Sequence, residues 1–211
     1  MNTKWRLADI VEYEIESTKS IIKTSSANRK EILQFRNDLC KREVLKGKTT
    51  PPFYYIMPQK QHDKSEFIDL VNLLMEHGVD VYKLSEDVNI NNRLYNTGDI
   101  VVPLSQPFRP FIKEVMERQK FPLRHYTPNG KIIKPYDITS WSLPLHRGVR
   151  SIEINEMSNK IEPLLSQIKG GYSLENKMPD NYWGVLLSIN NNESFKIAFS
   201  ALIKRIGRKK N

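Results

Sequence analysis

Residues 53–78, FYYIMPQKQHDKSEFIDLVNLLMEHG, combine an apolar run, a polar turn and an amphipathic segment. The run at 53–57 is rich in aromatic residues and lies between prolines, which favours a buried strand over a helix. Asp63 is placed to cap a helix, and Glu66, three residues later, completes a capping box. The apolar residues that follow recur at helical spacing and form one face: Phe67, Leu70, Val71 and Leu74.

The residues after this helix predict a second strand. Gly78 supplies the left-handed residue that ends the helix, and apolar residues then alternate at Val79, Val81 and Leu84. Strand, helix and strand in this order form a βαβ unit, so the sequence predicts a parallel pairing of the two strands.

Helices are also expected before this unit, and a hairpin after it. Two apolar stripes within residues 1–48 predict two antiparallel helices that end near Gly47. Residues 93–104 predict a hairpin turning at Gly98, in which Pro103 limits how centrally the second strand can pair.

The rest of the chain alternates between strand and helix patterns. The elements expected there are a helix at 107–118, an irregular segment at 121–148 with a helical turn near 137–143, a strand at 151–154, a helix at 161–168, a strand at 183–189 and a helix capped by Asn192. This order predicts an α/β fold with an open, mostly parallel sheet. The expected domains are a helical hairpin with its linker at 1–48 and an α/β domain at 49–211.

The net charge of +9 lies at the two ends of the chain. Residues 51–200 hold 17 basic and 17 acidic side chains, whereas residues 1–50 and 201–211 carry net charges of +4 and +5. A basic last turn complements a helix C-terminus, and no recognition module or stacking motif accompanies it. Nucleic acid is therefore not expected as a partner.

Neither a membrane span nor an export signal is visible. No run reaches the ~18 apolar residues of a span, and the first residues carry acids within their apolar pattern. Cys40 is the only cysteine, so the chain has no internal disulfide. Taken literally, the sequence predicts a cytoplasmic chain.

Motifs for catalysis or metal binding are missing from the sequence. No nucleophile elbow, phosphate loop or zinc spacing occurs, and His77 with Asp80 is the only pair that resembles metal ligands. Because Gly78 ends the helix between them, His77 is interpreted as a solvated residue at a helix end. We therefore expect neither a catalytic residue, nor a metal site, nor a cofactor in this chain.

The best candidate site is chosen by position. Gln59, Gln61, His62 and Asp63 lie in the turn after the first strand, where open α/β sheets place ligand crevices. The alternative interpretation is that Asp63 only caps its helix and that the others are solvated. A second cluster comprises Tyr136, Trp141 and His146, although aromatic residues in a loop more often anchor it to the core.

Three long segments resemble a known family: PFYYIMPQKQHDKSEFIDLVNLLMEHGVDVYKL at 52–84, RLYNTGDIVVPLSQPFRPFIKEVMERQ at 93–119 and PYDITSWSLPLHRGV at 135–149. Together they are similar to the region that follows the catalytic domain in bacterial zinc carboxypeptidase-like proteins. The resemblance implies a class I glutamine amidotransferase-like domain of flavodoxin-like architecture, incomplete at its C-terminal end. It also implies an upstream carboxypeptidase A-like domain as partner, and a periplasmic or secreted parent protein.

The family's chemistry does not carry over to this chain. Its zinc ligands, a His-x-x-Glu pair with a later His, belong to the upstream domain, and Cys40 does not lie on the elbow of the amidotransferase nucleophile. The resemblance therefore predicts a non-catalytic accessory portion of a metallocarboxypeptidase-like protein, inactive on C-terminal peptide substrates by itself. The alternative hypothesis is a stand-alone α/β binding module for a small polar or peptide ligand.

Overall fold

The computed structural model describes residues 4–120, 122–134, 141–173 and 194–200, and comprises one unit up to Arg42 and a second from Glu43 onward. The N-terminal region holds the two predicted helices, α1 (Leu7–Ala27) and α2 (Arg29–Thr49). α1 has no buried residue, and Ile32 and Phe35 of α2 are exposed as well. The apolar stripes predicted to pack between two antiparallel helices are therefore exposed.

The second unit is built on a five-stranded sheet whose order is β6-β1-β5-β2-β7. Its strands are β1 (Tyr54–Met57), β2 (Tyr82–Leu84), β5 (Ile100–Pro103), β6 (Ile152–Ile154) and β7 (Leu165–Gln167). Every neighbouring pair is antiparallel. The α/β class is confirmed, whereas the predicted mostly parallel, flavodoxin-like sheet is wrong.

The predicted strand-helix-strand unit is present in a different form. β1 leads into α3 (Lys64–Glu76) and then into β2, and both strands run antiparallel to β5. β1 and β2 are therefore parallel to each other, but β5 lies between them. The element types were predicted correctly from local patterns, and the insertion of β5 was not.

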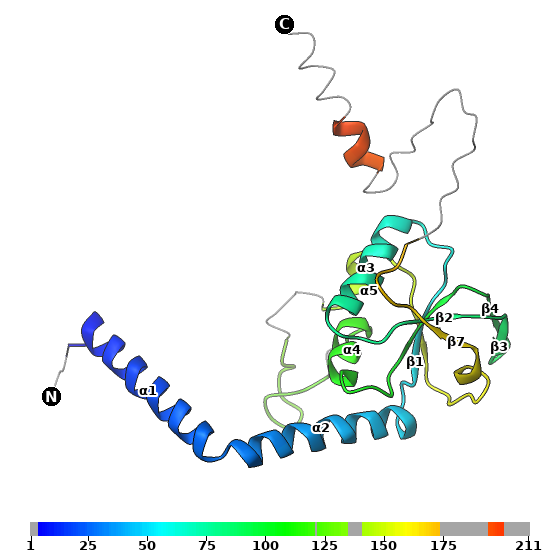
Figure 1. Ribbon diagram of the computed structural model, residues 1–211. Coiled ribbons are helices and arrows are strands. Elements are labelled where there is room, and N and C mark those ends of the chain that lie inside the picture. Colours follow the sequence, from blue (N-terminus) through cyan, green and yellow to red (C-terminus); the bar gives the residue numbers. More distant parts are fainter. Residues whose placement is uncertain (1–3, 121, 135–140, 174–193, 201–211) are drawn as a thin grey trace, which may run out of the picture. The chain divides into compact units, whose positions relative to one another are not determined.

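Both faces of the sheet are covered, and this explains the misleading sequence pattern. Figure 1 shows α3, α4 (Arg109–Met116) and α5 (Leu143–His146) on one side and the hairpin of β3 (Val88–Ile90) and β4 (Arg93–Tyr95) on the other. Consecutive residues of β1 enter two different cores, Tyr55 and Met57 on the helical side and Tyr54 and Ile56 on the hairpin side. A run that is apolar at every position indicates a strand with both faces covered. Such runs are common in parallel sheets but are not confined to them.

The predicted hairpin at 93–104 has a different partner. β4 pairs with β3 across Asn91 and Asn92, whose φ angles are +51° and +59°, while β5 pairs with β1 and β2. Asparagine tolerates this left-handed conformation, so the two residues form the turn that was attributed to Gly98. Pro103 is the last residue of β5, and a proline, which has no backbone N–H to donate, is tolerated at the end of this central strand.

The C-terminal part agrees with the prediction in places. β6 forms at the predicted strand, and residues 194–200 are helical as expected. Residues 161–168, predicted as a helix, instead form a 3-10 turn (Glu162–Leu164) and the edge strand β7. The strand predicted at 183–189, Asn192, and residues 137–140 lie outside the described residues.

The end of α2 packs directly onto the sheet. A Cβ at Gly47 would lie 2.1 Å from the carbonyl oxygen of Leu104, so the helix backbone meets the end of β5 with no side chain between them. α2 ends at Thr49 and thus continues past Gly47, near which it was predicted to end. In the same corner, Arg109 is 7% exposed and donates to the carbonyl oxygens of Thr50 and Pro51, both at 3.2 Å.

The buried carboxylate of Asp99 joins the ends of the three central strands. It is 3% exposed and accepts the backbone N–H of Gln59 at 2.8 Å and that of Asn96 at 3.0 Å. Its backbone carbonyl accepts the N–H of Leu84, at the end of β2, at 2.9 Å. This single residue therefore connects the turn after β1, the end of β2 and the start of β5.

Gly47→Ala is expected to lower the free energy of unfolding by about 1–3 kcal/mol because the new methyl group meets backbone atoms that cannot move aside. At an ordinary helix position the same change stabilises by up to about 1 kcal/mol. Denaturant unfolding measures the difference, and Lys48→Ala, at an exposed neighbour, is the matched control. A stabilised Gly47→Ala protein would contradict this close packing.

Asp99→Asn is expected to lower the free energy of unfolding by about 1–3 kcal/mol. An asparagine has one acceptor oxygen, so its NH₂ group would face one of the two backbone N–H groups that Asp99 now accepts. Urea unfolding is the measurement. Asp87→Asn is the control, since Asp87 also accepts two hydrogen bonds, from Thr97, but is exposed to water that can replace them.

Candidate functional site

Most polar atoms of the predicted turn are engaged within the chain. The Gln61 amide donates to the carbonyl oxygens of Pro58 and Arg150 and accepts the N–H of Arg150 at 2.8 Å. Asp63 accepts the backbone N–H groups of Ser65 and Glu66, and thus caps α3 as predicted. Gln61 and Asp63 therefore have structural roles in this turn.

The other two residues of this turn are exposed. Gln59 is held through its backbone by Asp99, and His62 makes no hydrogen bond within the described part of the chain. The reason for choosing this turn was the shared carboxyl edge of a parallel sheet, which an antiparallel sheet does not have. Ligand binding by Gln59, Gln61, His62 and Asp63 stays a prediction.

Of the remaining candidates, His77 and His146 lie at the C-terminal ends of α3 and α5. His77 is exposed at the C-terminal end of α3, where its ring stacks on Phe111 with centroids 5.4 Å apart, as its interpretation as a helix-end residue predicted. Trp141 is 55% exposed, and Tyr136 lies outside the described residues. In the portion that the structure describes, no three His, Cys, Asp or Glu side chains converge in a group that could hold a metal ion.

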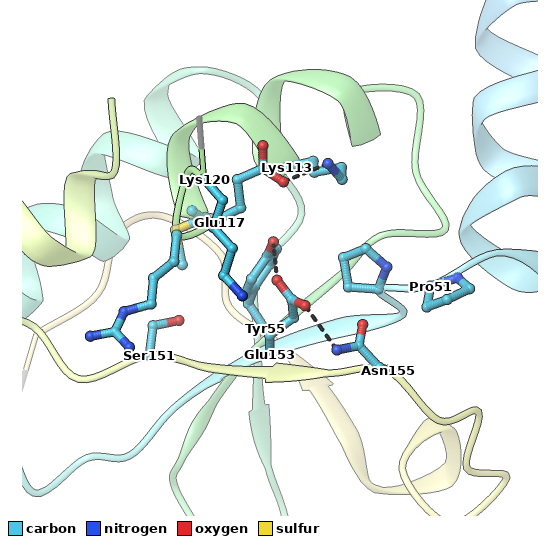
Figure 2. Close-up of a pocket in the computed structure, with 11 residues that line it drawn as sticks. Pro51, Tyr55, Lys113, Glu117, Lys120, Ser151, Glu153 and Asn155 are labelled. Atoms are coloured by element: carbon cyan, nitrogen blue, oxygen red, sulfur yellow. Dashed lines mark hydrogen bonds and ion pairs between the residues drawn. The ribbon is translucent and has the colours of Figure 1, made fainter. Parts of the chain in front are cut away.

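A polar pocket of about 610 Å³ lies elsewhere, between α4 and the β1–β6 edge of the sheet (Figure 2). Its walls come from three distant segments of the sequence: the Pro51–Pro52 peptide with Tyr55, the end of α4 with the residues that follow it, and β6. The lining residues are Pro51, Pro52, Tyr55, Lys113, Met116, Glu117, Arg118, Lys120, Ser151, Glu153 and Asn155.

A fixed network forms the β1–β6 side of the pocket (Figure 2). Tyr55 and Glu153 are direct cross-strand partners, and the Tyr55 hydroxyl donates to Glu153 Oε2 at 3.1 Å. Asn155 Nδ2 donates to the other carboxylate oxygen at 2.8 Å. Burial of Tyr55, which is 2% exposed, and the adjacent Glu153 carboxylate raise the pKa of its phenol well above its usual range. Tyr55 therefore stays neutral and holds Glu153 in place as a donor.

The opposite side of the pocket carries most of its charged side chains. Lys113 and Glu117 form an ion pair one turn apart on α4. Arg118 and Lys120 follow α4, and neither makes an ion pair or hydrogen bond with its side chain among the described residues. Between the two sides, the Ser151 hydroxyl is buried and has no hydrogen-bond partner in this part of the chain. Two cations and one hydroxyl are thus available to a ligand.

A buried ion pair supports the proline wall of the pocket. Arg109 Nη1 lies 3.8 Å from Glu43 Oε2, and Lys46 donates to the other oxygen of Glu43 at 2.8 Å. Through its bonds to the carbonyls of Thr50 and Pro51, Arg109 fixes the segment that forms the proline wall. Charged residues are rarely this buried unless they are paired. The Glu43–Arg109 pair therefore connects the end of α2 to the start of α4.

Sequence reasoning missed this pocket. Glu153 is flanked by Ile152 and Ile154 in β6, and this alternation indicates a strand with one polar face. Nothing in the sequence pairs β6 with β1, however, and Lys120 follows a helix whose orientation depends on the sheet. Glu153 was therefore recognisable as a surface residue, and its position opposite Tyr55 was not.

Comparison of the chain with protein-family models, with curated proteins and with solved structures finds no match. Separately, no helix in the described ranges is both long enough and apolar enough to cross a bilayer. The function is therefore argued from the pocket.

The raised pKa of Tyr55 predicts a loss of stability at alkaline pH. An unfolded tyrosine ionises near pH 10, and the folded protein holds the proton more tightly. The stabilisation is complete below that pH and is lost progressively as the pH rises above it. Between about pH 9 and 11, the free energy of unfolding should fall less steeply in Tyr55→Phe than in the wild type.

The control for this measurement is Tyr126→Phe, because Tyr126 is 74% exposed. This variant should keep the wild-type pH dependence. The other buried tyrosines remain in all three proteins, so the comparison isolates the contribution of Tyr55. Identical slopes for Tyr55→Phe and the wild type would contradict the assignment.

Proposed function

We propose that the domain from Glu43 onward is a binding module for a small polar ligand that carries an anionic group, a carboxylate or a phosphate. The observation that carries this proposal is the pocket near β6, where two cations without a partner among the described residues, and a buried hydroxyl, lie with a fixed Tyr55–Glu153–Asn155 network. Its volume of about 610 Å³ is within the range of small-molecule sites.

The pairing of charges supports the anionic class of ligand. Glu117 is neutralised by Lys113, and both oxygens of Glu153 already accept a hydrogen bond. Glu153 keeps its negative charge, so outside the Lys113–Glu117 pair the lining carries two cations, Arg118 and Lys120, against one carboxylate. Arginine and lysine at a pocket rim form charge-assisted hydrogen bonds with carboxylate or phosphate oxygens. The Ser151 hydroxyl adds a neutral donor to the lining.

The accessory role beside a zinc carboxypeptidase-like domain remains a prediction. It was linked to a flavodoxin-like sheet, and the antiparallel order found here makes the binding module the better supported function. Zinc, in that prediction, belongs to the upstream domain.

Thermal unfolding of the full chain with sodium phosphate, citrate and the dipeptide Gly-Gly tests the proposal. A bound anion at 100 times its dissociation constant stabilises the protein by about 2.7 kcal/mol, which raises the melting temperature by roughly 5 °C or more. Lys120→Met and Ser151→Ala should abolish this shift. Lys160→Met, at an exposed lysine distant from the pocket lining, is the matched control.

Two other outcomes would count against the pocket. A shift that survives Lys120→Met and Ser151→Ala but is lost in Gln59→Ala or His62→Ala would move the site to the turn after β1. The absence of a shift with all three probes at millimolar concentration would contradict binding of an anionic group.

A further inference from the structure

The network of Tyr55, Glu153 and Asn155 offers mainly acceptors to the pocket (Figure 2). Tyr55 donates its single hydroxyl hydrogen to Glu153 Oε2, so its oxygen can only accept a further hydrogen bond. Each carboxylate oxygen of Glu153 has about two acceptor sites and uses one of them within the network. Asn155 Oδ1 accepts no hydrogen bond in the described part of the chain. Several acceptor sites around one carboxylate are therefore open to a ligand.

The negative charge of Glu153 needs compensation when a ligand enters. Glu153 is exposed in the free protein, where water solvates its carboxylate. A ligand that fills the pocket removes part of this water, which is costly for a charge that gains no opposite charge in return. Glu153 forms no ion pair within the described ranges, and Lys113 is already paired with Glu117. The compensating charge must therefore come from the ligand, and an ammonium group, with three donors and no acceptor, supplies it.

The donors of the pocket require an anionic group on the same ligand. Arg118 and Lys120 carry only donors, and the Ser151 hydroxyl is buried without a partner among the described residues. A carboxylate or a phosphate accepts hydrogen bonds from groups of this kind. A ligand with an anionic group alone would satisfy these donors but would bring a second negative charge close to Glu153. A ligand with a cationic group alone would leave the donors unused.

On the basis of the function proposed above, we infer that the ligand is a zwitterion: an amino acid, a short peptide or an aminoalkyl phosphate. Its ammonium group binds the network around Glu153, and its carboxylate or phosphate binds Arg118, Lys120 and Ser151. A neutral hydroxyl in place of the ammonium group leaves the Glu153 carboxylate uncompensated, so the pocket discriminates between an amine and a hydroxyl at this position.

Isothermal titration calorimetry of the full chain with two pairs of isosteric ligands tests this discrimination. Gly-Gly is compared with glycolyl-glycine, and O-phosphoethanolamine with 2-hydroxyethyl phosphate; a hydroxyl replaces the amine in the second member of each pair. At about pH 6.5, where a peptide amino group is protonated, the zwitterion of at least one pair should bind about tenfold more tightly or better, because its analogue lacks a charge-assisted hydrogen bond. The pair that binds more tightly identifies the anionic end as a carboxylate or a phosphate.

Glu153→Gln should remove the preference for the amine. The zwitterion should bind about tenfold more weakly to this variant, whereas the hydroxyl analogue should bind as before or more tightly, because the charge that repels its anionic end is gone. A variant that only disturbs the pocket would weaken both members of a pair alike. Glu156→Gln, at an exposed acid outside the pocket lining, is the matched control and should keep the wild-type preference. The wild-type comparison needs no variant, so it tests the inference even if Glu153→Gln does not fold.

The results that would overturn the inference are distinguishable from failure of the proposed function. Equal affinity for both members of each pair would exclude the zwitterion and leave the proposed function standing, since that function requires only the anionic group. Binding of phosphate or citrate without binding of either zwitterion would have the same meaning. An equal loss of both members of a pair in Glu153→Gln would place the ammonium group away from Glu153. No binding of any of these ligands would contradict the proposed function and the inference together.

Discussion

The sheet depends on the buried Asp99 carboxylate, which accepts hydrogen bonds from two backbone N–H groups. β5 lies between β1 and β2, two strands that only α3 separates in the chain. To occupy this position, its first residues must reach the ends of both strands. Asp99 makes this connection, with its side chain on Gln59 and Asn96 and its backbone carbonyl on Leu84. A charged group in this position is stable because each of its oxygens is hydrogen-bonded. Once β5 is held there, β1 is available on its other edge for β6.

The pairing of β6 with β1 creates the pocket. It places Glu153 directly opposite Tyr55, and the hydroxyl and the carboxylate then hold each other in a fixed geometry. The end of α4 closes the other side, and its position is set by the buried Arg109 and Glu43. The ligand proposal therefore depends on contacts between segments that are close only in the folded chain.

The two parts of the chain present different kinds of surface. The domain from Glu43 onward covers both faces of its sheet with buried apolar side chains. α1 leaves its apolar stripe in solvent and separates its charges by sign along its length. A pocket suits a small ligand, whereas an amphipathic helix suits a helical partner.

The sequence alone determined the local structure. The capping of α3 by Asp63, its buried face, the left-handed Gly78 and the strands β1 and β6 all follow from interactions within a few residues. The candidate turn at 59–63 was also located correctly, since it depends only on where β1 ends and α3 begins. Asn91 and Asn92 are residues that favour a left-handed turn, but Gly98 was the stronger turn signal in the sequence.

Tertiary structure decided the sheet order, the strand directions and the pocket. A continuous apolar run such as that of β1 or β5 specifies that both faces are covered, and it does not specify by which elements or in which direction the neighbours run. The choice of neighbours rests on interactions such as those of Asp99, Arg109 and Gly47. The contacts of Asp99 with Gln59, of Arg109 with Glu43 and of Gly47 with Leu104 each join residues at least 40 positions apart, and local periodicity carries no information about such contacts.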